Sequence, residues 1–352
     1  MKTLSLAVVG CGRIGRVHAS NIVARIPAAR LAGLADVNLA AAREIAGPSG
    51  VEQITDDYRE LLGNPSIDAI VICSATSTHA QVIEEAAQAG KHIFCEKPID
   101  LEPGRIRQAL DAVEKAGVKL QIGFNRRFDP AFARLKEQVA AGKIGTPHIV
   151  RITSRDPAPP PIAYVRVSGG LPLDMMIHDF DMVRFLTGQE AVEIYATGSA
   201  MIDPEIGLAG DVDTCVATIR LSGGAIATID NSRQAIYGYD QRVEVFGSAG
   251  LLMAGNPPAE NDVLPDRSGV PSGRPPHFFL ERYQESYLIE MREFVESVIH
   301  DRMPPVNGRD GLIPVIMGRA AIQSLREGQP VKLGTSGSAP DAFHQFTGTS
   351  IH

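Results

Sequence analysis

Short apolar runs alternate with amphipathic segments along the first 124 residues. The apolar runs predict buried strands at Leu4–Val9, Leu31–Ala35, Ala69–Cys73, His92–Cys95 and Leu120–Gly123. The amphipathic segments predict helices at Ile14–Arg25, Leu39–Ala46, Thr78–Ala89 and Glu102–Ala116. Strands that alternate with helices favour a doubly wound parallel sheet, so we expect the α/β fold class here.

The pattern changes after residue 124, where we place a domain boundary. Helices are predicted at Pro130–Ala140, Asp174–Leu186, Phe278–Asp301 and Ile313–Glu327, the last with Pro314 in its first turn. Strands are predicted at His148–Thr153 and, as an antiparallel meander, over Glu190–Leu252. We expect a surface loop over Leu252–Pro276. The domains are therefore 1–124, 125–333 and a disordered tail, 334–352.

Composition excludes several classes of protein. Of the 352 residues, 44% are hydrophobic and 21% charged, as in an average globular protein, and no apolar run is long enough to span a membrane. The net charge of −7 argues against nucleic acid or an anionic membrane as a partner. The four cysteines have no metal-type spacing and no export signal precedes them, so we expect reduced thiols and a cytoplasmic location.

The first candidate for chemistry is a glycine-rich loop. Gly10, Gly12 and Gly15 form a GxGxxG with Arg13 and Ile14, between a predicted strand and a predicted helix. This context favours binding of a dinucleotide pyrophosphate at the helix N-terminus. Asp36 ends the second strand, where an acid binds the adenosine ribose and repels a 2′-phosphate, so NAD is favoured over NADP. The alternative is an ordinary turn with a helix-capping aspartate.

Two further patterns carry candidate catalytic groups. Lys97 follows the fourth strand, at the edge of the sheet where ligands bind, and its ammonium suits a developing alkoxide; a surface lysine is the alternative. Asp174 and His178 are four residues apart, so one helix face would hold a carboxylate beside an imidazole, an arrangement suited to acid–base catalysis. The alternatives are a structural histidine, or a metal site that includes Asp181.

Four motifs together resemble the Gfo/Idh/MocA family of NAD(P)-dependent oxidoreductases. They are the glycine loop with Asp36, CEKP at Cys95–Pro98, GFNRRFDP at Gly123–Pro130, and the Gly169–Asp179 segment that contains Asp174 and His178. The likeness runs over residues 4–330. It implies a Rossmann domain followed by an α+β domain with a large, mostly antiparallel open sheet. The free face of that sheet is expected to join copies of the chain into a dimer or tetramer.

The resemblance also implies roles for single residues. Lys97, Asp174 and His178 form the expected catalytic triad, with His178 as general base and no metal. Beside the glycine loop and Asp36, the expected cofactor contacts are Val37, Ser74, Thr76, His79, Glu96 and Lys97. The expected substrate contacts are Asn125, Arg127, Asp156, Tyr237 and Tyr287.

Three segments are most similar to the inositol-oxidising members of the family: Ser154–Pro161, Ser168–Leu186 and Tyr237–Gly247. The expected reaction is therefore NAD-dependent oxidation of a cyclic polyol, as in inositol catabolism. The substrate that we expect before any other is myo-inositol. A scyllo-inositol, chiro-inositol or glucose dehydrogenase, and a glycosidase that uses NAD transiently, remain alternatives. A non-catalytic NAD-binding regulator is a further one, against which the intact triad argues.

Overall fold

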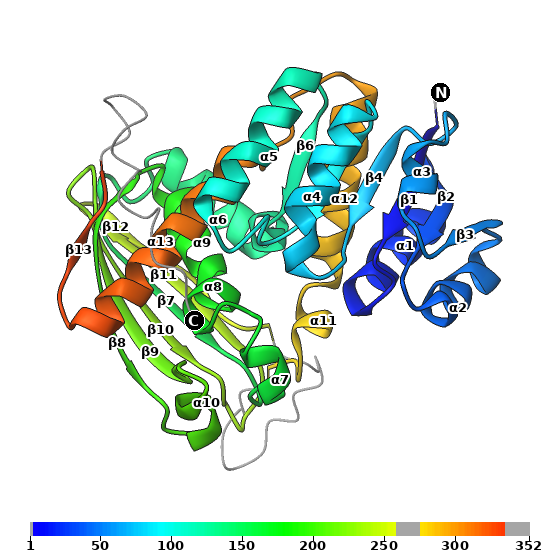
Figure 1. The fold of residues 1–352 in the computed structure, drawn as a ribbon. Coiled ribbons are helices and arrows are strands. Elements are labelled where there is room, and N and C mark those ends of the chain that lie inside the picture. The colour runs from blue at the N-terminus through cyan, green and yellow to red at the C-terminus, as the bar shows by residue number, and fades with distance from the viewer. Residues whose placement is uncertain (1–2, 258–274, 335–352) are drawn as a thin grey trace, which may run out of the picture. The chain divides into compact units, whose positions relative to one another are not determined.

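The computed structural model describes residues 3–257 and 275–334, and the chain divides into two compact units (Figure 1). The first unit takes the chain up to Phe128 together with Glu285–Val315. The second takes Asp129–Gln284 and the chain from Ile316 onward. This division differs from a single boundary at residue 124, because a late segment returns to the first unit. The expected tail after residue 334, and most of the expected loop over Leu252–Pro276, lie outside the described residues.

The first unit contains a six-stranded sheet whose paired strands are all parallel, in the order β3-β2-β1-β4-β5-β6. Its strands are β1 (Leu4–Val9), β2 (Ala29–Ala35), β3 (Gln53–Thr55), β4 (Ala69–Ile72), β5 (His92–Glu96) and β6 (Leu120–Gly123). Its helices are α1 (Arg13–Arg25), α2 (Leu39–Ser49), α3 (Arg59–Leu62), α4 (Thr76–Gln88), α5 (Pro103–Ala116) and α12 (Gln284–Ile299), with a 3-10 turn, η1 (Asn125–Phe128). The doubly wound parallel sheet is confirmed.

Helix α12 packs into the core of this unit although it comes late in the chain. Leu288, Met291 and Phe294 are each at most 1% exposed and lie in one hydrophobic cluster with Leu6 and Val8 of β1. The same cluster includes apolar residues of α1 and α2. Burial of this apolar face stabilises the helix against the sheet.

The second unit contains a seven-stranded sheet in the order β12-β11-β7-β10-β9-β8-β13. Its strands are β7 (Pro147–Arg155), β8 (Ala191–Ser199), β9 (Thr214–Leu221), β10 (Ile226–Ser232), β11 (Asp240–Gly247), β12 (Gly250–Ala254) and β13 (Val331–Lys332). All neighbours pair antiparallel except β10 and β7, which pair parallel. The expected large, mostly antiparallel sheet is confirmed, although it is not one meander, because β11 pairs with β7 and not with β10.

The helices of this unit include α6 (Pro130–Ala140), α7 (Ile162–Val165), α8 (Leu171–Asp174), α9 (Met176–Thr187), α10 (Pro204–Leu208) and α11 (Phe279–Arg282). Helix α13 (Gly308–Glu327) begins in the first unit and continues into the second. Figure 1 draws α8 and α9 over one face of the sheet, and α9 contacts β7 and β10. This contact places the residues of α9 over the middle of the sheet.

Three predicted helices differ from the structure. The helix expected at Asp174–Leu186 is divided into α8 and α9 at Met175, whose backbone (φ −101°, ψ −56°) departs from ideal helical values. The helix expected at Phe278–Asp301 is divided at Tyr283, where ψ is 19°. Helix α13 begins at Gly308, so Pro314 lies inside the helix and not in its first turn.

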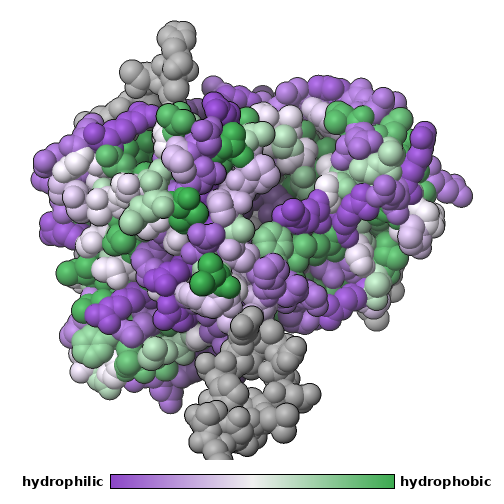
Figure 2. All heavy atoms as spheres, turned by 90° about the horizontal axis from the view of Figure 1, so that it is seen from below, coloured by the Kyte–Doolittle hydropathy of each residue, from purple (hydrophilic) through white to green (hydrophobic). Residues whose placement is uncertain are grey.

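The surface of the described residues mixes polar and apolar side chains. On the face that Figure 2 shows, hydrophobic residues are dispersed among hydrophilic ones and form no single continuous patch. Among the described residues, none of the helices has both the length and the apolar character needed to cross a bilayer.

Candidate active site

The glycine-rich loop connects β1 to α1 in a geometry that excludes side chains at two positions. Gly10 has φ +96°, and a Cβ there would lie 2.5 Å from the backbone of Cys73 and Ser74. A Cβ on Gly15 would lie 1.9 Å from the carbonyl oxygen of Gly10. Glycine at these positions therefore allows the tight turn and the close packing of α1 on β1.

The loop backbone at Gly12 and the N-terminus of α1 leave room for a dinucleotide pyrophosphate. A Cβ added to Gly12 would have no neighbour within 4 Å, so the backbone there is open to an approaching ligand. Within the part of the chain that the structure describes, no side chain caps the N-terminus of α1, where backbone N–H groups and the helix dipole favour an anion. Arg13, the first residue of α1, is exposed at the same place, and Ile14 follows it half-buried.

Asp36 shapes the loop and lies just after β2, where a ribose is expected to bind. Its Oδ2 accepts the backbone N–H of Cys11 at 2.6 Å, and its Oδ1 accepts that of Asn38 at 2.8 Å. Because each carboxylate oxygen has two lone pairs, both oxygens can still accept ribose hydroxyls. The next residue, Val37, is 92% exposed. These features fit the expected adenosine end of the cofactor.

The turns after β4 and β5 are joined by His79 of α4. Its ring is 2% exposed, with Nδ1 2.8 Å from the carbonyl oxygen of Pro98 and Nε2 2.9 Å from that of Ser74. Burial lowers the pKa of His79. Thr76 begins α4 beside these contacts. His79 therefore connects the turn after β4, at Ser74, with the turn after β5, at Pro98.

Glu96 and Lys97 stand at the carboxyl end of β5. Glu96 is the last residue of the strand, and Lys97 is half-buried before a cis peptide bond to Pro98. In open α/β sheets this edge is where ligands bind, at the point where the strand order reverses. The structure thus brings Lys97 to the same edge of the sheet as the glycine loop.

The cysteines near this edge are inert packing groups. Cys11 and Cys95 have no exposed surface, and all four cysteines are free. Burial, followed by the charge of Asp36, raises the pKa of Cys11 to about 12. A thiol with so high a pKa forms little thiolate at neutral pH, so it reacts slowly.

Asp174, at the end of α8 in the second unit, is held by two partners. Its Oδ1 accepts a hydrogen bond from the Tyr164 hydroxyl at 2.8 Å, and its Oδ2 accepts one from Arg233 Nη1 at 3.1 Å. The Arg233 side chain is only 1% exposed, so its positive charge is almost wholly removed from water. A charge held away from water in this way interacts strongly with the carboxylates around it.

Asp211 is the second carboxylate near Arg233. One of its oxygens lies 3.7 Å from Arg233 Nη2, and both accept the backbone N–H of Leu171, the first residue of α8, at 3.0 Å. Burial raises the pKa of Asp211, and the Arg233 charge opposes that rise. Arg233 thus connects both ends of α8. It pairs with Asp174, the last residue of the helix, and lies beside Asp211, which accepts the N–H of the first residue, Leu171.

His178 lies in the first turns of α9, half-buried, and its neighbour Asp179 anchors the helix. Asp179 is fully buried and accepts hydrogen bonds from Ser154 of β7 at 2.6 Å and from Asn231 of β10 at 2.8 Å. These charge-assisted bonds fix α9, and so His178, on the sheet.

The structure does not gather the ligands of the alternative metal site. Among the described residues, three metal-type donors come within 4.8 Å of one another only at His18, Glu96 and Glu290. Asp174, His178 and Asp181 form no such group. They also do not share one continuous helix, because of the break at Met175.

The expected substrate contacts are spread over both units. In the first, Arg127 pairs with Asp310 at 2.9 Å, Asn125 is buried, and the Tyr287 ring packs edge-on against His18. In the second, Asp156 directly follows β7, and the Tyr237 hydroxyl donates to Asp240 at 2.7 Å. Lys97 likewise belongs to the first unit, and Asp174 and His178 to the second.

Sequence reasoning missed Arg233, Asp211 and Tyr164, the residues around Asp174. Arg233 is 59 residues from Asp174 along the chain, and no spacing rule connects the two. The available signal was that Arg233 directly follows a strand with alternating apolar residues, in a chain whose candidate catalytic residues include an aspartate.

Two family models match most of the chain. One, described as an oxidoreductase family with an NAD-binding Rossmann fold, matches residues 4–124. The other, described as a GFO/IDH/MocA C-terminal domain, matches residues 132–253.

The chain is also similar to proteins from three bacteria. It is 49% identical to an uncharacterized oxidoreductase, YrbE, of Bacillus subtilis over 94% of this chain and 97% of the relative. It is 48% identical to a myo-inositol 2-dehydrogenase of Thermotoga maritima over 94% and 98%. A solved structure of scyllo-inositol dehydrogenase from Lactobacillus casei, with NAD(H) and scyllo-inositol bound, superimposes with a TM-score of 0.88 at 32% identity, over 94% and 99%.

A substitution at Asp36 tests the cofactor site. Asp36→Ala removes the acceptor for the ribose and for the Cys11 N–H, so we expect the Kd for NAD to rise about tenfold or more. The Kd for NADP is expected to change less, because the variant also removes a charge that repels the 2′-phosphate. Calorimetric titration with both cofactors measures this. Asp56→Ala, at an exposed aspartate, is the control. Unchanged NAD affinity in Asp36→Ala would contradict the assignment.

Proposed function

Because the chain belongs to the Gfo/Idh/MocA family of NAD-binding oxidoreductases, we propose that it oxidises myo-inositol to 2-keto-myo-inositol and passes the hydride to NAD. The observation that carries this proposal is the 48% identity, over nearly the whole chain, to a protein named myo-inositol 2-dehydrogenase. An identity this high over both units favours a shared reaction over a shared fold alone.

In the proposed reaction His178 is the general base. The substrate hydroxyl loses its proton to His178 while the hydrogen on the same carbon leaves as hydride, so that a C=O bond forms. Bound NAD supplies the hydride acceptor. Lys97 donates a hydrogen bond to the same oxygen and stabilises its alkoxide character. These roles balance one proton and one hydride for each ketone formed.

Asp174 orients the site and sets its charge. Its two hydrogen bonds, from Tyr164 and Arg233, fix the carboxylate beside the buried Arg233 charge. An anion held in this way favours a protonated, cationic group nearby. It therefore supports the imidazolium that His178 becomes when it accepts the proton.

The polyol contacts are proposed on the same basis. The hydroxyl groups of an inositol need donors and acceptors in fixed positions. Arg127 is held by its ion pair with Asp310, and Tyr237 by its bond to Asp240. We assign these two residues, with Asn125, Asp156 and Tyr287, to the polyol hydroxyls.

A second candidate substrate is scyllo-inositol, which differs from myo-inositol in the orientation of one hydroxyl. The L. casei structure that resembles this chain holds it together with NAD(H). The first experiment is therefore to follow NADH absorbance with myo-inositol, scyllo-inositol, D-chiro-inositol and glucose, each with NAD and with NADP. We expect the highest kcat/KM for myo-inositol with NAD. No turnover of any polyol by a chain that binds NAD would contradict the proposal.

A variant at His178 tests the mechanism. Without a positioned base we expect His178→Ala to lose about 10²- to 10⁴-fold in kcat. The Kd for NAD should stay within about twofold, because the glycine loop and Asp36 are unchanged. His300→Ala removes an exposed histidine and serves as the control. Turnover by His178→Ala close to that of the unaltered chain would remove His178 from this role.

We further propose that two or four copies of the chain associate through the outer face of the second sheet. An apolar row crosses four strands on that face: Ile226 of β10, Ile149 of β7, Phe246 of β11 and Leu251 of β12, which pair in register. Ile226, Phe246 and Leu251 are 43–47% exposed. A contiguous apolar row of this kind favours a partner surface, and a second copy offers the same row.

The mass of the protein in solution tests this association. Phe246→Lys places a charge within the row and should therefore weaken the association. Light scattering after size-exclusion chromatography gives the mass. We expect the variant to be a monomer if the unaltered chain is a dimer, and a dimer or monomer if the unaltered chain is a tetramer. Lys143→Glu, at an exposed residue outside the row, is the control. A monomeric unaltered chain would contradict the proposal.

We also propose that the protein is located in the cytoplasm. The four cysteines are all free thiols, as is usual in a reducing compartment.

A further inference from the structure

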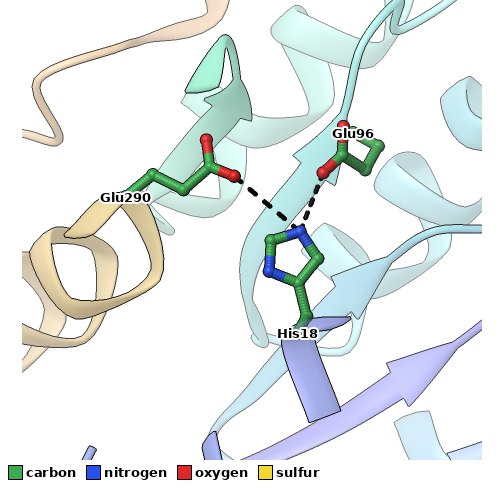
Figure 3. A group of neighbouring side chains, drawn as sticks. All are labelled: His18, Glu96 and Glu290. Carbon is green, nitrogen blue, oxygen red and sulfur yellow. Dashed lines mark hydrogen bonds and ion pairs between the residues drawn. The ribbon is translucent and has the colours of Figure 1, made fainter. Parts of the chain in front are cut away.

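Three ionisable side chains from distant parts of the chain meet inside the first unit. His18 comes from α1, Glu96 from the end of β5 and Glu290 from α12 (Figure 3). His18 Nε2 lies 2.8 Å from Glu96 Oε1 and 3.9 Å from Glu290 Oε1. The side chains of His18 and Glu290 have no exposed surface, whereas that of Glu96 is 13% exposed. None of the roles proposed above uses His18 or Glu290.

The hydrogen bonding distinguishes the two carboxyl groups. Glu96 accepts a bond from His18 Nε2, while both carboxyl oxygens of Glu290 are buried and find no hydrogen-bond partner among the described residues. A charged carboxylate in that position would have neither water nor a close donor. Burial accordingly raises the pKa of Glu290 well above its ordinary value, and the charge of Glu96 raises it further. Burial and the neighbouring charge therefore favour the protonated, neutral form of Glu290.

His18 contacts Glu96 through Nε2. Among the described residues, its Nδ1 is buried without a hydrogen-bond partner. The thiol of Cys73, just after β4, also lies near Glu290, and burial raises its pKa well above the ordinary value. Of the two carboxyl groups, Glu96 is the one with a hydrogen-bond donor, so it is the better placed to carry a negative charge.

A hydrogen bond between His18 and Glu96 explains the arrangement of these side chains better than a bound metal ion does. One imidazole and two carboxylates are common metal ligands, but Nε2 and Oε1 already lie at hydrogen-bond distance. Aromatic rings also surround the histidine, with Phe94 at 4.9 Å and Tyr287 at 5.8 Å between ring centroids. The geometry is that of a buried donor that holds one carboxylate.

Glu96 lies in the half of the sheet that is expected to receive the nicotinamide. The glycine loop and Asp36 follow β1 and β2, so the adenosine belongs to the β1–β2–β3 half, and the nicotinamide to the β4–β5–β6 half. Glu96 ends β5, the middle strand of that half. Gly123 of β6 pairs with it and leaves room for the carboxylate, because a Cβ on Gly123 would lie 2.9 Å from Glu96 Oε2.

We propose that His18 holds Glu96 as a fixed anion beneath the nicotinamide, and that this anion favours the oxidised cofactor over the reduced one. The nicotinamide ring is cationic in NAD⁺ and neutral in NADH, so a nearby negative charge stabilises only the oxidised form directly. Lys97 contributes an opposite charge, which is the same in every variant compared below. The proposal needs only the cofactor, and its test uses no polyol.

The test compares the affinities of NAD⁺ and NADH in matched variants. Glu96→Gln keeps the shape and the acceptor for His18 but removes the charge, so we expect the ratio Kd(NAD⁺)/Kd(NADH) to rise about tenfold. Glu290→Gln replaces a neutral group with a neutral one and should leave the ratio within about twofold. Glu96→Asp retains the charge and should keep most of the preference. Glu114→Gln, at an exposed residue of α5, is the control for net charge.

Calorimetry with NAD⁺ and fluorescence titration with NADH give the two constants, and thermal unfolding confirms that each variant folds. If Glu96→Gln does not fold, Glu96→Met takes its place as the uncharged variant. An unchanged ratio in the uncharged variant would overturn the proposal. A shift in Glu290→Gln as large as that in Glu96→Gln would also overturn it, because the charge would then lie on Glu290. Since no substrate is present, either result is distinguishable from failure of the proposed reaction.

Discussion

The close approach of helix α1 to strand β1 is the constraint on which the first unit depends. It brings the Gly15 backbone so near the Gly10 carbonyl that any side chain would collide with it. The approach aims the uncapped N-terminus of α1 at the edge of the sheet where the other strands also end. Asp36 ties the same loop to β2 through the Cys11 N–H. A phosphate-binding surface made of backbone groups follows from these contacts.

Buried charge organises both units, in opposite ways. In the second unit a buried arginine, Arg233, lies between Asp174 and Asp211 and compensates their carboxylates. In the first unit a buried histidine holds Glu96, while burial, and then the charge of Glu96, raises the pKa of Glu290 well above its ordinary value. Burial of an unpaired charge is costly, so each cluster reaches a state in which the remaining charges have donors.

The repeating strand–helix pattern and the glycine loop could be predicted from the sequence because both are local. Strands β1 and β6 have the predicted bounds, and Asp36 lies at the end of β2 as expected. Strand β3 has only three residues, too few to show a period, and it was missed. The break at Met175 was also missed, because no proline or glycine marks it.

The partners of the candidate catalytic residues could not be predicted for a different reason. Arg233 reaches Asp174, and Glu290 reaches His18, only because the chain folds back over long distances. The return of Glu285–Val315 to the first unit is likewise a tertiary effect, carried by the apolar face of α12. Single-sequence patterns report periods and motifs, whereas these contacts depend on topology.

We propose above all that Lys97 and His178 act on one substrate hydroxyl. A crystal structure of the chain with NAD and myo-inositol bound would measure this geometry. We expect one inositol oxygen within about 3.2 Å of both Lys97 Nζ and a ring nitrogen of His178, with the attached carbon facing the nicotinamide. An inositol ring bound next to the nicotinamide but out of hydrogen-bond reach of His178 would exclude His178 as the base.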